Sequence, residues 1–323
     1  MLLFKHWIDE YQKNRLTATM IKAIVVYFDD PSAMGYPFDE PNYYLSYQGF
    51  SELCQKHNID FYIARGSESY LGHSQFRSGW QFGESGLIKI NHSITADVIY
   101  VKGNTLVTEP GVQRVNQAGL MDICRNKLKT YALFGQYMPQ TLPLPEKNWP
   151  DVIKKITTDK IVIKPVSGME GRGIVVVDKT QFDYTQLDQS HAPFLVQEFI
   201  DCSAGIPGLV TGRHDLRLYI FNGVMKLAEY RQPKTGSYLA NVAQGGSLTV
   251  LNLNQVPSWA SEFVNIIDQH LTEYYPRIYT IDLMYAQNRP YLVELNSRPG
   301  LPYPGWSYYN DLHRYILETL TKN

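Results

Sequence analysis

Two acidic residues near the C-terminus, Asp282 and Glu294, lie in neighbouring segments that both resemble β-strands. Alternation along IYTIDLMYAQNRPYLVELNSRPG, residues 278–300, places Glu294 and Asn296 on one face of the second segment. A turn centred on Asn288, with an odd number of loop residues, brings position 282 directly opposite 294. Opposed residues have β-carbons about 5 Å apart, so the two carboxylates repel each other unless a cation lies between them.

An all-oxygen set of this kind suits Mg²⁺ or Mn²⁺, with bound phosphates as the remaining ligands. The alternative is an edge hairpin on which both carboxylates face solvent. The apolar neighbours Ile281, Leu283, Leu292, Val293 and Leu295 make a wholly solvated hairpin unfavourable. The sequence therefore predicts a metal site at Asp282, Glu294 and Asn296.

A glycine-rich loop, KPVSGMEGRG at residues 164–173, joins two β-rich runs. It lacks the GK[ST] ending of a Walker A motif and the strand-to-helix context of a dinucleotide fingerprint. Gly168, Gly171 and Gly173 allow the backbone to turn its N–H groups toward an anion, although an ordinary hairpin has the same composition. Lys164 is placed either to neutralise a phosphate or to extend to solvent.

Several motifs occur in a fixed order: a helix-opening Lys127, the glycine loop, LVQEFID (195–201), DLR (215–217), N-x-x-x-GG (241–246) and the final D…E-x-N. This order, over about residues 126–300, resembles the ATP-grasp superfamily, in the branch with glutathione synthetase and the RimK-type glutamate ligases. The resemblance implies an α/β (α+β) fold, in which a small N-terminal parallel α/β domain precedes two α+β subdomains that clasp ATP.

The resemblance also implies roles for individual residues. Lys127 and Lys164 would hold the ATP phosphates, Glu198 and the following backbone would bind the adenine edge, and Asp201 would reach the ribose. The implied nucleotide-binding positions are Lys127, Lys164, Ser167, Gly168, Gly171, Gly173, Gln197, Glu198, Phe199, Ile200, Asp201 and Asn241. Arg217 and Arg231 would lie over the γ-phosphate and the acceptor, and Asn241 would close the far side.

Two features depart from a simple match. Leu239 stands where relatives often carry an arginine, so one cation is missing or is supplied by another residue such as Arg298. Asn222-Gly223 predicts a two-residue hairpin turn. Strict alternation through that turn would put Arg217 and Arg231 on opposite faces, whereas a β-bulge would put them on the same face.

The activity implied is that of an ADP-forming ligase, in which a phosphorylated carboxylate is attacked by an amine. Phosphoryl transfer depends on positioning and on cations that spread negative charge, here Lys164, Arg217, Arg231 and Mg²⁺. The substrates would be small-molecule or peptide carboxylates and amines. Arg298 and, in the segment 66–86, Arg77 are candidate substrate contacts. A phosphotransferase and a non-catalytic nucleotide-binding module remain the alternatives.

The predicted secondary-structure elements that must position these residues differ between the two parts of the chain. Strands at 21–28, 59–64 and 97–102 with a helix at 43–57 predict a small parallel α/β unit, and 65–86 is expected to be a long loop. After residue 126 strands dominate. We expect an amphipathic helix over 1–20, a pre-ATP-grasp domain over 21–125 and an ATP-grasp domain over 126–323, divided into a flap subdomain (138–200) and a metal-binding subdomain (201–323).

Composition narrows the function classes. The 323 residues include 30 Lys and Arg against 31 Asp and Glu, so no basic footprint for nucleic acid or an anionic membrane is present. No apolar run is long enough to span a bilayer. Three scattered cysteines exclude a disulfide framework and favour the cytoplasm, and eight histidines lack the spacing of a zinc site. Relatives are commonly dimers or tetramers, so a homo-oligomer is compatible with the family.

Overall fold

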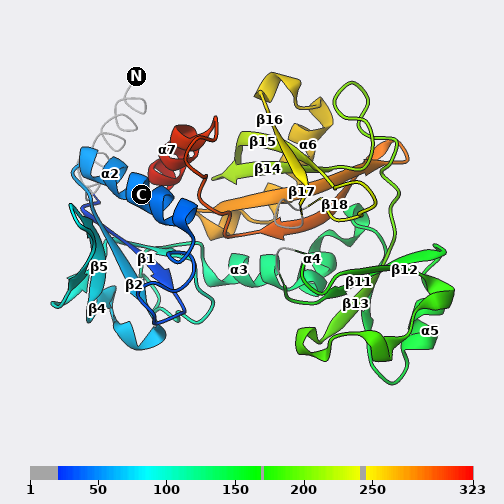
Figure 1. Ribbon diagram of the computed structural model, residues 1–323, viewed down its shortest axis with the longest axis horizontal. Helices are drawn as coiled ribbons and strands as arrows, with labels where there is room; N and C mark the ends of the chain where they lie inside the picture. Colours follow the sequence, from blue (N-terminus) through cyan, green and yellow to red (C-terminus); the bar gives the residue numbers. More distant parts are fainter. Residues whose placement is uncertain (1–20, 169–170, 241–244, 323) are drawn as a thin grey trace, which may run out of the picture. The chain divides into compact units, whose positions relative to one another are not determined.

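The computed structural model describes residues 21–168, 171–240 and 245–322, which divide into two units (Figure 1). Unit 1 comprises residues 21–115 together with 301–322, and unit 2 comprises Asn116–Gly300. The helix expected over residues 1–20 lies outside the described residues. The structure thus groups residues 301–322 with unit 1, whereas the sequence analysis assigns them to the ATP-grasp domain. The domain boundaries expected from the sequence, after residues 20 and 125, stay a prediction.

Unit 1 is built on a six-stranded sheet in the order β6-β5-β2-β1-β8-β9. The central strand β1 (Ala23–Phe28) pairs in parallel with β2 (Asp60–Arg65) and β8 (Val98–Val101), and β8 pairs in parallel with β9 (Arg114–Val115). Residues 24–27 of β1 are fully buried, as expected for a parallel strand covered on both faces. The predicted parallel α/β unit is therefore present.

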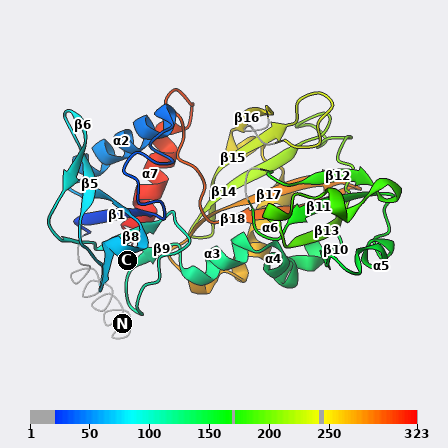
Figure 2. The ribbon, with the colours of Figure 1, turned by 60° about the horizontal axis from the view of Figure 1, so that its bottom comes forward.

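Two helices of unit 1, α2 (Pro41–Lys56) and α7 (Tyr309–Leu320), lie side by side in both ribbon views (Figures 1 and 2). The Ser46 hydroxyl lies 3.1 Å from His313 Nε2, and the Phe50 ring meets the His313 ring edge-on. This packing explains why the C-terminal helix belongs with the N-terminal strands.

The expectation of a long loop at 65–86 is wrong. The segment forms the strands β3 (Tyr70–Gly72), β4 (Gln75–Phe76) and β5 (Gly79–Gly83), and β5 pairs with β6 (Gly86–Ile90) in a hairpin. A separate small sheet has the order β3-β4-β7, with β7 at Ile94–Thr95. Strands of two to five residues, several of them bounded by glycine, contain too few alternations for a period to be visible in the sequence.

The first sheet of unit 2 has the order β10-β13-β11-β12, with all neighbours antiparallel. Its strands are β10 (Thr141–Leu144), β11 (Lys160–Pro165), β12 (Val175–Asp178) and β13 (Phe194–Glu198) (Figure 2). Ile161, Ile163 and Val196 bury one face, together with Ile153 of α5 (Trp149–Lys154). The glycine loop joins β11 to β12, so the predicted hairpin is confirmed.

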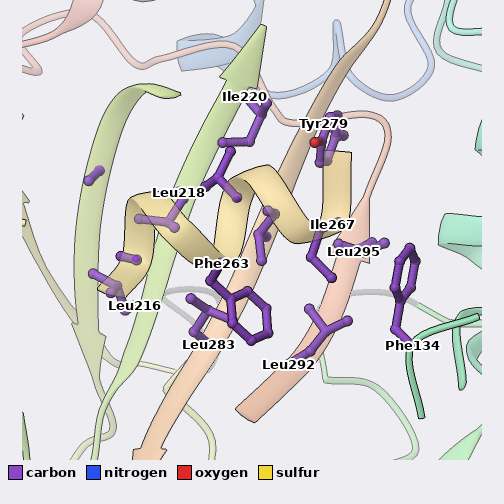
Figure 3. Close-up of a cluster of buried hydrophobic side chains, with 14 of the residues drawn as sticks. Phe134, Leu216, Leu218, Ile220, Phe263, Ile267, Tyr279, Leu283, Leu292 and Leu295 are labelled. Atoms are coloured by element: carbon purple, nitrogen blue, oxygen red, sulfur yellow. The ribbon is translucent and has the colours of Figure 1, made fainter. Parts of the chain in front are cut away.

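The second sheet of unit 2 has the order β16-β15-β14-β17-β18. Its strands are β14 (Asp215–Phe221), β15 (Val224–Gln232), β16 (Ser247–Leu251), β17 (Ile278–Ala286) and β18 (Arg289–Asn296). Figure 3 shows one face, where Leu216, Leu283 and Leu295 pack on Phe263 and Ile267 of α6 (Ser258–Gln269). Because side chains alternate, the other face carries the remaining, mostly polar residues.

Two short helices, α3 (Ala118–Arg125) and α4 (Lys127–Phe134), add Leu120 and Phe134 to the same core. Short 3-10 helices occur at Ser67–Ser69, Gly135–Tyr137, Lys179–Gln181, Tyr184–Gln186, Gln189–His191, Leu253–Gln255 and Thr272–Tyr274. Within the described ranges, no helix has the length and apolar character that crossing a membrane requires.

Candidate nucleotide and metal site

The strands β17 and β18 pair Asp282 directly with Glu294, and Thr280 with Asn296. The predicted opposition of the two carboxylates is confirmed, but the turn that produces it differs from the expected one. The turn has two residues, Gln287 and Asn288, both with positive φ (51° and 59°). A register shift beside Asp282 supplies the extra residue, so a two-residue turn plus a bulge gives the same pairing as an odd loop.

Asp282 is 2% exposed and is held by two arginines. Arg217 donates from Nε to Oδ1 at 2.7 Å and from Nη2 to Oδ2 at 2.6 Å, which is a bidentate pair. Arg231 Nη2 lies 3.1 Å and Asn296 Nδ2 3.4 Å from the same Oδ2. Burial opposes ionisation, but the two guanidinium groups outweigh it and hold the pKa of Asp282 below its usual value.

A second bulge brings the two arginines onto one face of the sheet. Between β14 and β15 the register shifts next to Tyr219, after the turn at Asn222 and Gly223. The extra residue interrupts strict alternation and reverses the face of the residues that follow it in β15, so that Arg217 and Arg231 both reach Asp282. Of the two alternatives left open by the sequence, the bulge is the one observed.

Asp215 is a buried acid of the same face that the sequence analysis did not single out. It lies opposite Arg231 in the register, and Arg231 Nη2 donates to its Oδ2. Burial raises the pKa of Asp215 to about 6, against the opposing effect of Arg231. The DLR motif contained the signal, because Asp215 and Arg217 are two residues apart and must share a face of a strand.

Lys127 and Lys164 lie close to the acidic pair. The Asn126 side chain accepts hydrogen bonds from the first-turn N–H groups of α4 and so caps the helix that Lys127 opens. Lys127 Nζ donates to the Gly168 carbonyl at 3.0 Å and lies 3.5 Å from Glu294 Oε1. Burial lowers the pKa of Lys164 to about 8; Lys127 acts in the same direction and Glu294 against it. The glycine loop, the start of α4 and β18 therefore meet at one place.

The end of β13 carries the residues expected at the adenine. The Gln197 amide donates to Thr141 Oγ1 at 2.7 Å and is buried within the sheet. The Glu198 carboxylate accepts hydrogen bonds from the Gln140 N–H and the Thr157 hydroxyl, which fix its orientation. Both side chains therefore have protein partners, and an adenine contact would fall mainly to the neighbouring backbone.

The next three residues leave the sheet. Phe199 packs edge-on against Tyr238, and Ile200 joins a small apolar cluster around Cys202. Asp201 is exposed, and its Oδ1 lies 3.8 Å from Arg213 Nη2. Their nucleotide-binding roles stay predictions.

The remaining candidates are spread over both units. Ser167 and Gly168 are exposed, and Gly171 and Gly173 have the positive φ (75° and 71°) that favours glycine. Asn241 lies outside the described residues. Arg298, half-buried, follows β18 in unit 2, whereas Arg77 is exposed between β4 and β5 of unit 1. Leu239 is half-buried, so the departure from the family pattern stands.

The donor set fits a hard divalent cation. Asp282 and Glu294 are paired across two strands, and Asn296 adds an amide two pairs further along, on the same face. Among the described residues, no group of three or more His, Cys, Asp or Glu side chains is arranged to hold a metal. A cation here would therefore need the amide and ligand oxygens in addition to the two carboxylates, as phosphates would provide.

Comparison with known proteins identifies the class. A family model described as an ATP-grasp domain matches residues 124–302, which is more than half of the chain, so the chain belongs to the ATP-grasp family. The predicted family and α+β fold are confirmed.

Among its relatives, a probable alpha-L-glutamate ligase from Legionella pneumophila is 25% identical over 205 residues, covering 59% of this chain and 61% of that protein. The D-alanyl-alanine synthetase A from Vibrio cholerae has a similar structure, with a TM-score of 0.59 at 14% identity over 94% of this chain and all of that one. A RimK domain ATP-grasp protein from Sphaerobacter thermophilus gives 0.55 at 11% identity, covering 93% and 100%. At these identities the two structures show the shared fold alone.

Proposed function

We propose that this chain is an ATP-dependent carboxylate–amine ligase that forms an amide bond and releases ADP and phosphate. One observation carries the proposal: Asp282 and Glu294 face each other on a sheet face that also presents Arg217 and Arg231, with Lys127 beside Glu294. The relatives named as glutamate ligases support the same reaction class.

Lys127 and Lys164 would bind the nucleotide phosphates, because both are buried cations close to the glycine loop. Asp282, Glu294 and Asn296 would hold Mg²⁺, or Mn²⁺ in its place, which would offset the negative charge of the phosphates. The glycine loop would limit the access of water, which competes with the amine for an acylphosphate.

Arg217 and Arg231 would stabilise the negative charge on the phosphoryl group in the transition state of its transfer. An oxygen of the substrate carboxylate forms a bond to the γ-phosphorus while the bond to ADP breaks. The amine nitrogen then bonds to the carbonyl carbon, phosphate leaves and the amine loses a proton. No side chain needs to form a covalent intermediate, so positioning and charge suffice.

The substrates we propose are small-molecule or peptide carboxylates and amines, with Arg298 and Arg77 as candidate contacts. The relatives' names make an amino-acid carboxylate the first choice to test. We place the activity in the cytoplasm because all three cysteines are free thiols, compatible with a reducing compartment.

An ADP-release assay tests the proposal by crossing carboxylates (L-glutamate, D-alanine, short peptides) with candidate amines. A ligase releases ADP and phosphate only when both substrates are present. ADP formed with a hydroxyl acceptor alone would indicate a phosphotransferase, and no release under any condition a non-catalytic module. Glu294→Gln should lower ADP release about 1000-fold, whereas Glu262→Gln, which changes an exposed carboxylate of α6, should not.

A further inference from the structure

Arg231 and Asp215 form an ion pair that is only half made. Arg231 Nη2 donates to Asp215 Oδ2, yet Arg231 Nε and Asp215 Oδ1 are both buried without a hydrogen-bond partner in the described part of the chain. One of these atoms is a donor, the other is an acceptor, and they belong to two residues already in contact. Together they are the missing half of a bidentate arginine–carboxylate pair.

The second acceptor of Arg231 accounts for the missing half. Arg231 Nη2 is shared between Asp215 Oδ2 and Asp282 Oδ2, the latter at 3.1 Å. Sharing the nitrogen between two carboxylates prevents the parallel alignment that a fork-to-fork contact requires.

Asp282 Oδ2 is correspondingly crowded. It accepts from Arg217 Nη2 at 2.6 Å, from Arg231 Nη2 at 3.1 Å and from Asn296 Nδ2 at 3.4 Å. A carboxylate oxygen offers about two lone-pair positions. Of the two guanidinium contacts, the one from Arg231 is the longer, and it is not part of a bidentate pair.

We propose that Asp215 is a positioning residue that draws Arg231 away from Asp282 when the site is loaded. In the loaded arrangement, Arg231 pairs with Asp215 through both Nε and Nη2, and Asn296 turns its amide oxygen, in place of Nδ2, toward the cation. Asp282 Oδ2 then keeps the contact from Arg217 Nη2 and has one lone-pair position for the metal. The inference rests on the proposed function, since it assumes a divalent cation at Asp282. It assigns Asp215 a role that acts only through Arg231.

The exchange keeps the charges paired throughout. In the structure described here, Asp282 is neutralised by Arg217 and Arg231. In the loaded arrangement, Arg217 keeps its two contacts to Asp282, and Arg231 keeps a carboxylate partner in Asp215. Without Asp215, Arg231 would keep its hydrogen bond to Asp282 and would compete with the cation.

The test is a double-mutant cycle on Mn²⁺ binding, measured by electron paramagnetic resonance with ADP present and without turnover. Asp215→Asn should weaken Mn²⁺ binding about tenfold, as loss of an orienting partner does at metal sites. Arg231→Gln should bind Mn²⁺ at least as tightly as the wild type. The double variant should match Arg231→Gln, because Asp215 has nothing to position once the arginine is absent.

An equal weakening by Asp215→Asn in both backgrounds would mean that Asp215 acts through its charge alone, and would overturn the inference while leaving the ligase proposal intact. Absence of Mn²⁺ binding by the wild type would overturn both. The matched control is Asp268→Asn, which removes the carboxylate that pairs with the buried Arg277 on the other side of the sheet. This variant should leave Mn²⁺ binding unchanged. If Asp215→Asn does not fold, Arg231→Gln decides alone: weaker Mn²⁺ binding than the wild type contradicts the proposal.

Discussion

Buried arginine–aspartate pairs occur on both sides of the five-stranded sheet of unit 2, and they differ in how completely their hydrogen bonds are made. On the α6 side, Arg277 donates from Nε and Nη2 to the two oxygens of Asp268, and the Tyr279 hydroxyl donates to Oδ1 at 2.8 Å. On the opposite side, Asp282 is shared by two arginines, and Asp215 and Arg231 each keep a buried polar atom without a partner among the described residues.

The contrast separates a structural pair from one suited to receive a ligand. A buried polar atom without a partner costs about 1–3 kcal/mol, so folded proteins rarely keep one without a reason. The Arg277–Asp268 pair is complete and has nothing to exchange. In the Asp215–Arg231–Asp282 arrangement, Asp282 Oδ2 accepts three hydrogen bonds, whereas Arg231 Nε and Asp215 Oδ1 make none among the described residues. Arg231 can therefore exchange one carboxylate partner for the other when a ligand binds.

The largest effect expected on the ligand side is loss of turnover. Glu294→Gln removes one of the two opposed carboxylates while leaving the fold, because the Glu294 side chain is partly exposed. ADP release should fall about 1000-fold, the upper range for losing one group that stabilises developing charge. Asp268→Asn, assayed where it is folded, should keep the wild-type rate; equal losses in the two variants would remove the distinction between the pairs.

The reverse pattern is expected for stability. Asp268→Asn leaves Arg277 buried without its charged partner, which should lower the free energy of unfolding by about 3 kcal/mol. Urea denaturation followed by circular dichroism measures this. Glu294→Gln should change the same free energy by less than about 1 kcal/mol, and a larger loss would mean that Glu294 also has a structural role.

The pH dependence of nucleotide binding sharpens the comparison further. The pKa of Lys164 is lowered to about 8, so the side chain is charged below that pH and loses its proton as the pH rises. The negatively charged triphosphate binds the protonated form of Lys164 more tightly. ATP affinity should therefore be highest near pH 7 and about tenfold weaker at pH 9. Calorimetry at both pH values checks this.

Lys164→Arg is the control for that titration, since arginine stays protonated over the whole range. The variant should bind ATP with a flatter pH profile than the wild type. An unchanged, steep profile would assign the titration to another group.

The smallest effect is expected at Thr280, whose buried hydroxyl has no partner within the described ranges. Thr280→Val keeps the shape and removes the unsatisfied group, so the free energy of unfolding should rise by about 1 kcal/mol. The matched variant Thr130→Val loses a hydroxyl that donates to the Ile123 carbonyl at 2.7 Å and should lower it by a similar amount. A loss of stability in both variants would show that Thr280 has a partner after all.

The sequence predicts the facing carboxylates and the family, but not the two β-bulges that align the side chains of the site. Asp282 and Glu294 could be paired because residues 282 and 294 lie at even spacing about a recognisable turn, although the true turn is shorter and compensated by a bulge. A bulge has little signature in the local sequence, yet a register shift of one residue moves every later side chain to the opposite face of the sheet. The sequence therefore cannot decide whether Arg217 and Arg231 share a face.

Other differences have equally local causes. The sequence does not reveal the role of Asp215, because an acid at the start of an apolar strand has no visible partner until the neighbouring strand is placed. The strands within 70–83 are too short to show a period. The grouping of α7 with unit 1 depends on contacts such as Ser46–His313, which join residues 267 positions apart.

The most direct test of the central claim follows an oxygen atom. With the carboxylate and amine pair identified by the ADP-release assay, the carboxylate is labelled with ¹⁸O and the phosphate released is analysed by mass spectrometry. A ligase that phosphorylates the carboxylate transfers one labelled oxygen to each phosphate. Phosphate free of label, released together with amide product, would contradict the account.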